Sequence, residues 1–362
     1  MKNIAIIGTQ GVPAQYGGFE SLAENLIGSL KSNEVEYTVY CSGKAYKDRP
    51  SQYKGANLEY INFDANGAQS IIYDIISLIK ASCKHDIILV LGVSGCCFLP
   101  IYRLFARKKK LIINIDGLEH RREKWGKWAK KFLKFSEKMA IKYADTIITD
   151  NKGIQDYVTE EYGNDSVLIA YGGDHALANT MTIEEQLAIL HEYKLRANEY
   201  AITVCRIEPE NNCHITLEAF SQTNKNLVFI GNWDKSEYGK LLKEKYSKCD
   251  NITILDPIYN IDTLFALRKN AAMYIHGHSA GGTNPSLVEA MFFKIPIIAY
   301  RVVYNVETTQ NKASYFKDVE ELKGILMCAD ADNLGAQAAE LRRIADEQYT
   351  WSTIVTQYED TY

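Results

Sequence analysis

The chain has 362 residues, of which 46% are hydrophobic and 24% charged, and its formal net charge is −4. This length suits two domains, and this composition excludes a disordered chain. No apolar stretch approaches the ~18 to 20 residues of a membrane span. The apolar run that opens the chain is too short for the core of a secretion signal, so we expect it to be a β-strand.

Short apolar runs alternate with helical patterns along residues 1–170. This alternation predicts a parallel sheet with crossover helices. The predicted strands are Asn3–Ile7, Glu36–Cys41, Leu58–Ile61, Ile87–Leu91, Leu111–Ile115 and Thr146–Thr149, with helices such as Gly18–Lys31 and Ser70–Lys80 between them.

The same alternation begins again after Tyr171, where two glycines mark a turn or hinge. The fold class is therefore predicted as α/β, with two Rossmann-like doubly wound domains that begin at residues 1 and 171. Such sheets bind ligands at the carboxyl ends of their strands, so a substrate could lie in a cleft between the domains. The strands predicted here are Tyr200–Cys205, Leu227–Gly231, Ile252–Leu255, Met273–His276 and Pro296–Ala299.

A glycine-containing loop joins the strand that ends at His276 to a helix predicted to begin at Pro285. Asn at the cap and Pro at the first helical position are preferred at helix starts. The free N–H groups of the first turn could bind a phosphate, and glycine lets the backbone approach it closely. We therefore predict a phosphate site formed by His276, Gly281, Gly282, Thr283, Asn284, Ser286 and Leu287.

Three further features fit a nucleoside diphosphate. Glu289 lies one turn inside that helix and could bind two ribose hydroxyls, or could be an exposed helical Glu. Arg206 follows a strand and could pair with a diphosphate, or with Glu208 or Glu210. The opening loop (residues 8–17) lacks the dinucleotide-binding pattern of glycines. Gly17 and Gly18 could contact a diphosphate, or could form a plain turn.

These motifs resemble the GT-B glycosyltransferases of the large retaining group called family 4. Within that group the chain resembles a bacterial subgroup that includes rhamnosyltransferases of capsule and polysaccharide assembly. The resemblance implies that Glu289 binds the ribose, that Arg206 and the helix start bind the diphosphate, and that residues 171–345 are followed by a helix, residues 346–362, that crosses back onto the first domain. It is carried by GTQGVPAQYGGFE (residues 8–20), Asp116–Glu119, Tyr143–Asp145, Tyr171–Asp174, Arg206–Asn212, the helix start at residues 281–286, and Trp351 with Tyr358.

The chain departs from the wider family at the donor site. Gly281 stands where that family has a Glu, and Asn211 and Asn212 stand where it has a nearby Lys. The diphosphate would meet one cation fewer, and a 6-deoxy sugar such as rhamnose would fit the changed pocket. His120 replaces an aromatic residue that is usual in the subgroup.

We expect transfer with retention and without a metal or other cofactor. The one Asp-x-Asp pattern, at residues 330–332, is typical of a helix cap or turn. The leaving diphosphate would be neutralised by Arg206, backbone N–H groups and helix termini. Asp116 and Glu119 are the acidic groups that we place nearest the acceptor, with turn formation as the equally open alternative.

Residues 103–142 are rich in Lys and Arg, and Trp125, Trp128, Phe132 and Phe135 follow a helical spacing. The aromatic stripe could pack into the first domain, or the helix could lie on an anionic membrane. A lipid-linked saccharide acceptor, as the resemblance suggests, would favour the membrane, whereas no motif indicates nucleic acid. The residues predicted to face the membrane are Arg121, Arg122, Lys124, Lys127, Lys130, Lys131 and Lys134.

The eight cysteines show no zinc spacing and no C-x-x-C pattern, which favours free thiols in a reducing cytosol. We therefore expect a cytoplasmic protein, peripheral at the inner face of the cell membrane. Three alternatives stay open: a transferase with a UDP-hexose donor, a degenerate nucleotide-binding partner subunit, and an NAD-dependent oxidoreductase, against which the absent dinucleotide pattern argues.

Overall fold

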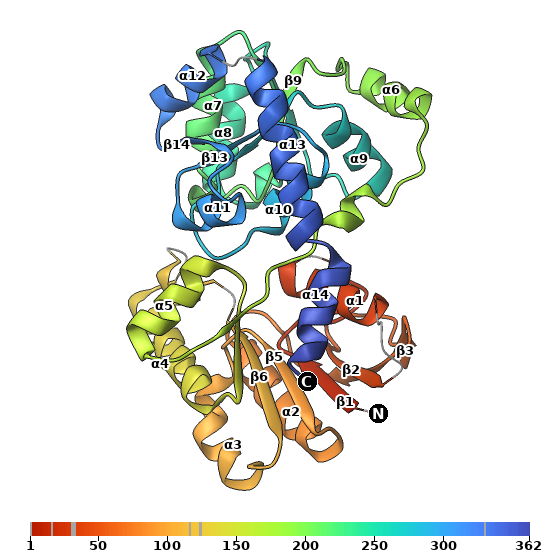
Figure 1. Cartoon of the computed structure of the whole chain (residues 1–362), viewed down its shortest axis with the longest axis vertical. Helices are drawn as coiled ribbons and strands as arrows, with labels where there is room; N and C mark the ends of the chain where they lie inside the picture. The colour runs from red at the N-terminus through yellow and green to blue at the C-terminus, as the bar shows by residue number, and fades with distance from the viewer. Residues whose placement is uncertain (1, 16, 30–33, 116, 123–124, 329–330) are drawn as a thin grey trace. The chain divides into compact units, whose positions relative to one another are not determined.

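The structure is a computed structural model that describes all residues except 1, 16, 30–33, 116, 123–124 and 329–330. The chain folds into two compact units (Figure 1). Unit 1 comprises Met1–Tyr171 with Trp351–Tyr362, and unit 2 comprises Gly172–Thr350. The divisions predicted from the sequence lay after residues 170 and 345. The second lies later in the structure because the helix before it continues to Gln348.

Unit 1 is built around a sheet with strand order β3-β4-β2-β1-β5-β6-β7-β8. All its pairs are parallel except β3 with β4. The central strand β5 has an unbroken apolar run, as expected of a strand that is covered on both faces. The strands are β1 (Lys2–Ile7), β2 (Val35–Ser42), β3 (Gln52–Tyr53), β4 (Ala56–Ile61), β5 (Ile87–Leu91), β6 (Lys110–Ile115), β7 (Thr146–Thr149) and β8 (Val167–Leu168).

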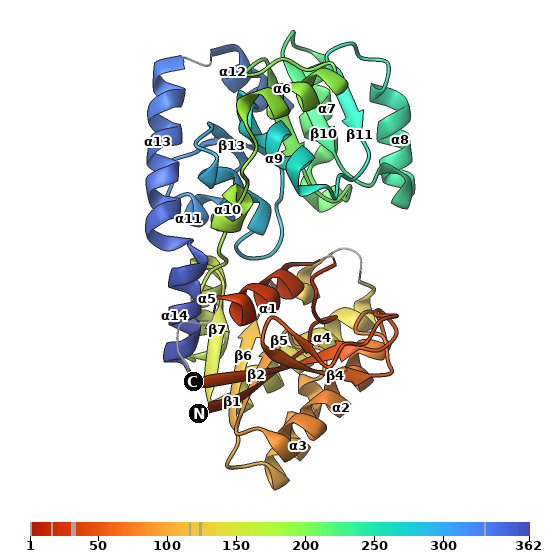
Figure 2. The same cartoon turned by 90° about the vertical axis from the view of Figure 1, so that its right-hand side faces the viewer.

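Helices cover the two faces of this sheet, with a separate apolar core on each. One core contains residues of α1 and α14, which lie side by side (Figures 1 and 2). The other contains residues of α2, α3, α4 and α5. The helices are α1 (Gly18–Gly28), α2 (Gln69–Lys84), α3 (Leu99–Phe105), α4 (Lys127–Tyr143), α5 (Lys152–Tyr162) and α14 (Trp351–Asp360), with short 3-10 turns η1 (Cys96–Phe98) and η2 (Glu119–Arg121).

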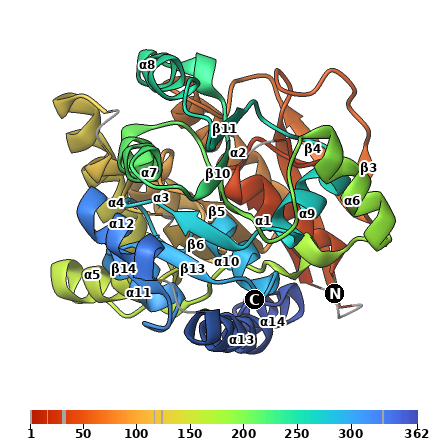
Figure 3. The same cartoon turned by 90° about the horizontal axis from the view of Figure 1, so that it is seen from above.

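Unit 2 is built around a fully parallel sheet with strand order β11-β10-β9-β12-β13-β14. Helix α7 packs beside α12, and α6 beside α9 (Figure 3). The strands are β9 (Tyr200–Val204), β10 (Asn226–Ile230), β11 (Ile252–Leu255), β12 (Met273–His276), β13 (Ile297–Tyr300) and β14 (Ser314–Phe316). The helices are α6 (Ile183–Glu192), α7 (Cys213–Ser221), α8 (Glu237–Tyr246), α9 (Ile261–Lys269), α10 (Pro285–Phe292), α11 (Val303–Thr308), α12 (Val319–Cys328) and α13 (Ala331–Gln348), with the turns η3 (Asp174–Leu177), η4 (Pro209–Asn211) and η5 (Trp233–Lys235).

The predicted α/β class with two Rossmann-like units is confirmed. The strands predicted at Ile87–Leu91, Ile252–Leu255 and Met273–His276 have the predicted bounds. The sequence analysis missed β3, β8 and β14, which are only two or three residues long and lie at or near sheet edges. Such short strands carry too few residues to show a hydrophobic period.

Candidate functional site

In unit 2, strands β9 and β12 are hydrogen-bonded neighbours, so the segments that follow them lie at the same edge of the sheet. Arg206 and η4 follow β9, and the 277–284 loop follows β12. The parallel pairing therefore brings together the two sequence segments on which the predicted phosphate site depends.

The start of α10 has the predicted cap chemistry. The side chain of Asn284 accepts a hydrogen bond of 3.0 Å from the N–H of Ser286, and Pro285 occupies the first helical turn. The N–H of Leu287 donates to the carbonyl of Asn284 at 3.0 Å. The expectation that the first-turn N–H groups are free was therefore wrong for Ser286 and Leu287, because the capping residue binds both.

Two positions of the 277–284 loop require glycine. Gly281 has a φ of +92°, which side chains rarely adopt. At Gly277 a Cβ atom would lie 2.2 Å from the carbonyl oxygen of Asn211, so the loop and η4 touch through their backbones.

Hydrogen bonds join the 277–284 loop to the segment after β9. Asn212 donates from Nδ2 to the carbonyl of Gly277 at 2.9 Å, and Nδ1 of His278 lies 2.6 Å from Oδ1 of Asn211. The N–H and hydroxyl of Ser279 both donate to the carbonyl of Glu210. From the sequence, we noted only that Asn211 and Asn212 stand where the wider family has a Lys. The structure shows that their amides fix the loop, a role that their position just after a strand could have suggested.

Arg206 lies just after β9, with its side chain 38% exposed. Its Nη1 atom is 3.8 Å from Oε2 of Glu208, a long contact for an ion pair. The side chain of Asn211 donates to the carbonyl of Arg206 at 2.6 Å, which ties its backbone to η4. The backbone of Arg206 is therefore fixed at the sheet edge, and its side chain is partly exposed to solvent.

Glu289 is not the exposed helical carboxylate that the sequence left open. Its side chain is 16% exposed and pairs with Nη1 of Arg268 at 2.7 Å. Nε2 of His175, in η3, lies 3.4 Å from its other carboxylate oxygen. Burial opposes ionisation, but the charge of Arg268 and the contact with His175 outweigh it and lower the pKa of Glu289 to about 2. The sequence analysis missed Arg268 and His175 because they lie far from Glu289 in sequence.

His276 ends β12 and is buried, with its ring stacked on that of Tyr274. Among the described residues, nothing hydrogen-bonds its Nε2 atom. Burial lowers the pKa of His276 well below its ordinary value, so the ring is neutral. A neutral imidazole cannot neutralise a diphosphate, although it can donate or accept one hydrogen bond.

In unit 1 the opening loop contacts acidic side chains of α1. The N–H of Gln10 donates to Oε1 of Glu20 at 2.9 Å, and the N–H of Ala14 donates to Oε2 of Glu24 at 2.5 Å. Gly17 precedes α1 with a φ of +140°, and a Cβ there would meet the Glu20 carboxylate. Donor contact by Gly17 and Gly18 stays a prediction. An anion bound there would meet the carboxylate of Glu20, whereas Glu24 is paired with Lys54 at 2.8 Å.

Of the two predicted catalytic acids, Asp116 lies outside the described residues. Glu119 begins η2, after β6, and both of its carboxylate oxygens have partners within the six residues that follow it. Oε2 accepts from Nε1 of Trp125 at 2.9 Å, and Oε1 lies 2.9 Å from Nε of Arg122. These contacts match the turn-forming alternative for Glu119.

The predicted aromatic stripe does not extend to Trp125. Helix α4 begins at Lys127, because Gly126 has an extended conformation, and Trp125 bonds to Glu119 instead. Trp128 is 85% exposed and Phe135 49% exposed, so neither packs into the core of unit 1. The expectation that the four aromatic residues form one stripe was therefore wrong.

The residues predicted to face the membrane differ in exposure and in their partners. Lys127, Lys130 and Lys131 lie on α4 with Lys127 and Lys131 exposed. Arg122 pairs with Glu119, and Lys134 pairs with Glu161 at 2.9 Å. Arg121 is exposed beside the ring of Tyr157. Lys124 lies outside the described residues.

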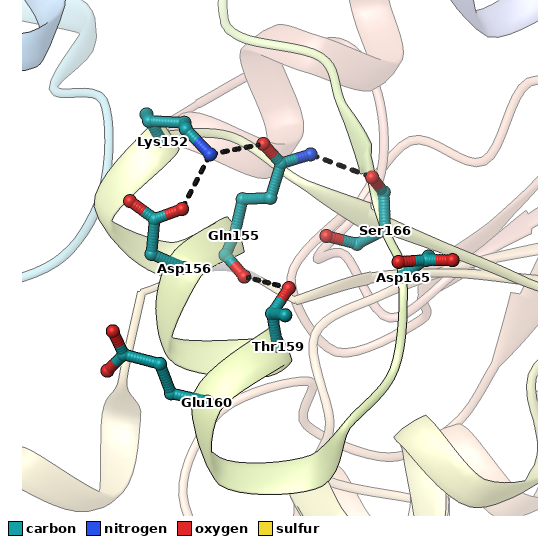
Figure 4. A pocket seen from close by; sticks show the side chains of 7 residues that line it. All are labelled: Lys152, Gln155, Asp156, Thr159, Glu160, Asp165 and Ser166. Atoms are coloured by element: carbon teal, nitrogen blue, oxygen red, sulfur yellow. Dashed lines mark hydrogen bonds and ion pairs between the residues drawn. The ribbon is translucent and has the colours of Figure 1, made fainter.

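A surface pocket of about 430 Å³ lies on α5 and the segment before β8 (Figure 4). Its side chains bond to one another: Lys152 to Gln155 and Asp156, and Gln155 to the carbonyl of Ser166. Three carboxylates line it against one lysine, so it is unsuited to a diphosphate. Among the described residues, no group of three or more His, Cys, Asp and Glu gathers as a metal site, and no helix is long and apolar enough to span a bilayer.

Two family models match successive parts of the chain. Residues 1–174 match a family model described as "Domain of unknown function (DUF1972)", and residues 189–324 match one described as "Glycosyl transferases group 1". None of the curated proteins matches the chain in sequence.

Solved structures of low sequence identity share the whole fold. Sucrose-phosphate synthase from Thermosynechococcus elongatus is 15% identical, with a TM-score of 0.82 over 100% of this chain and 98% of its own. HepE from Anabaena, in complex with UDP-glucose, is 15% identical, with a TM-score of 0.77 over 100% and 99%. The catalytic domain of starch synthase IV from Arabidopsis thaliana, bound to ADP and acarbose, is 12% identical, with a TM-score of 0.72 over 100% and 98%. The chain thus has the two-unit fold of the GT-B glycosyltransferases, and residues 189–324 in unit 2 match the glycosyl transferases group 1 family.

Proposed function

We propose that the chain transfers a sugar, with retention, from a nucleoside diphosphate to a lipid-linked saccharide in the synthesis of bacterial surface polysaccharide. The first candidate donor is dTDP-L-rhamnose. One observation carries the donor site of this proposal: an ionised, largely buried Glu289 lies on the helix that follows the 277–284 loop, in the unit that also presents Arg206.

Glu289 is the proposed ribose-binding residue. Its Oε2 is held by Arg268 at 2.7 Å, whereas its Oε1 has the longer contact of 3.4 Å with His175. Ribose hydroxyls can therefore donate to Oε1 without breaking the Arg268 pair. Because the pKa is lowered to about 2, the carboxylate accepts hydrogen bonds across the physiological pH range.

Arg206 and the 277–284 loop are the proposed diphosphate-binding groups. Arg206 would supply paired, charge-assisted hydrogen bonds, each about 1.5–3 kcal/mol. Since Ser286 and Leu287 donate to Asn284, we assign the backbone contacts to the preceding residues Gly281, Gly282 and Thr283. Asn211 and Asn212 add no charge and serve to hold the loop.

In the proposed reaction the acceptor oxygen attacks the anomeric carbon on the face that the diphosphate leaves. The bond from the anomeric carbon to the diphosphate oxygen breaks, the bond to the acceptor oxygen forms, and the acceptor proton passes to the leaving phosphate oxygen. Arg206 would stabilise the charge that develops on the diphosphate, without a metal. Since Glu119 already bonds within its turn, Asp116 is the better candidate to contact the acceptor.

A thermal-shift panel of dTDP, UDP and GDP sugars tests the donor site. A ligand that binds only the folded chain raises its melting temperature in proportion to the logarithm of its concentration over Kd. We expect dTDP-rhamnose to give the largest shift, and Arg206→Ala or Glu289→Ala to remove most of it. Arg196→Ala, in an exposed ion pair of the same unit, is the matched control. A shift that survives in Arg206→Ala would show that the diphosphate binds elsewhere.

The stereochemistry of transfer tests the mechanism separately. NMR of the product, compared with the donor, reports the anomeric configuration. Retention supports same-face attack, and inversion rejects it while leaving the donor site intact. Activity that disappears with EDTA and returns with a divalent cation would reject the metal-independent form of the mechanism.

A UDP-hexose is the second candidate donor. HepE, which shares the fold over the whole chain, has been solved in complex with UDP and with UDP-glucose. The same thermal-shift panel separates the two, because the base and the sugar differ between dTDP-rhamnose and UDP-glucose. Hydrolysis of the preferred donor, measured in parallel, distinguishes an enzyme from a nucleotide-binding partner subunit.

A further inference from the structure

The outer surface of α4 carries exposed aromatic residues beside cations. Trp128 and Phe135 are seven residues apart and therefore share one side of the helix. Lys131 lies between them and places its ammonium 5.4 Å from the centre of the Trp128 ring. Lys138 and Lys142, which are also exposed, continue the same side of the helix. The solvent-facing side of α4 therefore carries both aromatic and cationic side chains, and it lies opposite the face that packs in the core.

The exposed surface of α4 has no negative charge. The helix contains one acid, Glu137, and that residue is buried. Its carboxylate lies 2.9 Å from Nδ1 of His120 and accepts hydrogen bonds from the hydroxyls of Tyr157 and Tyr162. Lys134 is drawn into the same cluster, 3.5 Å from Glu137. The lysines on the outer side of α4 therefore have no acidic residue of the same helix beside them.

Helix α3 adds a second exposed apolar stripe. Ile101, Leu104 and Phe105 lie at spacings of three and four, and Leu104 is 69% exposed. The exposed cations Arg107 and Lys108 follow directly. The sequence analysis missed this stripe because the helix is short and its outer face is apolar where a polar one is usual.

Both helices turn these stripes away from the same core. Leu99 and Tyr102 of α3 pack in the apolar core that also holds Ala140 and Ile141 of α4. The two helices contact each other, and Arg103 of α3 donates to the carbonyl of Tyr143 at the end of α4. Their exposed stripes therefore lie on the same side of the unit 1 sheet. We call Ile101, Leu104, Phe105, Trp128 and Phe135, with Lys131, Lys138 and Lys142, the α3–α4 surface.

We propose that the α3–α4 surface docks unit 1 on an anionic lipid bilayer, with its apolar side chains in the interfacial region and its lysines against the headgroups. Exposed aromatic and aliphatic residues flanked by lysines fit a membrane interface. Nearby lysines add attraction to an anionic leaflet. The biological meaning of this docking rests on the proposed lipid-linked acceptor, whereas the binding itself does not.

A nucleic acid is the competing partner for a basic surface, but it would use the lysines and leave the apolar residues without a role. The apolar residues therefore decide between the two partners. Substituting them should weaken binding to lipid and leave binding to a phosphate polyanion unchanged.

Vesicle sedimentation of the full chain, without donor, tests the proposal. The vesicles are phosphatidylcholine alone, or phosphatidylcholine with about one third phosphatidylglycerol. We expect binding only to the anionic vesicles and weaker binding at high salt. The double variants Trp128→Ser with Phe135→Ser, Ile101→Ser with Leu104→Ser, and Lys131→Gln with Lys138→Gln should each lower the affinity at least about tenfold.

Two matched double variants in unit 2 serve as controls. Ile183→Ser with Ile261→Ser removes equally exposed apolar residues, and Lys225→Gln with Lys240→Gln removes equally exposed cations. Both should bind anionic vesicles as the parent chain does. Three vesicle results would overturn the proposal: equal binding to neutral vesicles, no vesicle binding, or full binding by the Trp128 and Phe135 variant. The proposal would also fail if the parent chain bound duplex DNA as tightly as anionic vesicles and the Trp128 and Phe135 variant kept that binding.

The thermal shift with nucleotide sugars is measured on the same variants. We expect it to be unchanged, because the substituted residues lie outside the donor site, and its persistence shows that each variant is folded. Loss of vesicle binding with an intact shift supports the docking surface. If the parent chain bound vesicles but no nucleotide sugar raised its melting temperature, the proposed function would be rejected and the membrane-docking proposal would stand.

Discussion

The two units each have a glycine-rich loop after a strand, and the two loops differ in the groups that hydrogen-bond to their backbones. The opening loop of unit 1 donates N–H groups to Glu20 and Glu24. The 277–284 loop of unit 2 is tied by the neutral side chain of Asn212 and by backbone carbonyls, at the sheet edge where Arg206 lies. Two loops that are alike in glycine content thus differ in the groups that bind them: the carboxylates of Glu20 and of Glu24, which is paired with Lys54, in unit 1, and amide and carbonyl groups in unit 2. The charge of the surrounding groups, rather than the glycine pattern, indicates which loop can bind an anion.

Glu137 and Glu289, whose carboxylates are both largely buried, sharpen the same contrast. Glu137 in unit 1 is surrounded by Tyr157, Tyr162 and His120, whereas Glu289 in unit 2 is paired with Arg268. In both, hydrogen bonds and nearby charge outweigh burial and lower the pKa. Of these two residues, Glu289 is the one on the helix that follows the proposed diphosphate loop, so an ionised buried carboxylate is not by itself a sign of a binding site.

The largest expected effect comes from removing the partner of Glu289. Arg268→Met should lower the free energy of unfolding by about 3–5 kcal/mol, because it leaves a buried carboxylate without its counter-charge. Urea denaturation measures this loss. Arg196→Met, in an exposed pair with Glu199, should cost less than about 1 kcal/mol. Equal losses in the two variants would mean that the Arg268–Glu289 pair is not buried in solution.

The loss of folding stability at acidic pH should depend on Glu289. Its pKa in the folded chain is lowered to about 2 from its ordinary value of 4.5, so its contribution to stability is present above pH 4.5 and is lost as the pH falls toward 2. Across that window, Glu289→Gln should reduce the proton uptake on unfolding by up to about one proton. Urea denaturation at several pH values gives the slope. Parallel slopes for the variant and the parent chain would contradict the lowered pKa.

An intermediate effect is expected where the 277–284 loop touches η4. Gly277→Ala would place a Cβ atom 2.2 Å from the Asn211 carbonyl oxygen, so we expect a loss of about 1–3 kcal/mol and weaker donor binding. Gly324→Ala, inside helix α12 with open space around it, is the control and should stabilise the chain by about 0.5–1 kcal/mol. Unchanged donor binding in Gly277→Ala would mean that the 277–284 loop does not form part of the donor site.

The smallest effect tests the opening loop directly. Glu20→Gln keeps an oxygen that can accept from the N–H of Gln10 but removes the negative charge beside Gly17. If Gly17 and Gly18 contact the diphosphate, as the sequence predicts, donor affinity should rise about two- to fivefold in isothermal titration, equal to about 0.4–1 kcal/mol. An unchanged Kd would mean that the opening loop does not contact the donor, so that of the two loops only the 277–284 loop would stay a candidate for donor binding.

The sequence by itself determined the fold class, the principal strands and the start of α10. These features follow from local patterns: unbroken apolar runs for buried strands, and Asn284 followed by Pro285 for a capped helix. The sequence also marked Glu289 and Arg206 as candidates, through a resemblance that covers nearly the whole chain.

Only the tertiary structure decided what those residues contact. Arg268 and His175 reach Glu289 from other elements, and Asn212 reaches Gly277 because β9 and β12 pair in parallel. Likewise, the exposed stripe of α3 could not be told from a core-facing one, since periodicity shows that a helix has an apolar side but not which way that side turns. Partners and orientation are set by pairing and packing between segments that lie far apart in the chain, and no local pattern encodes them.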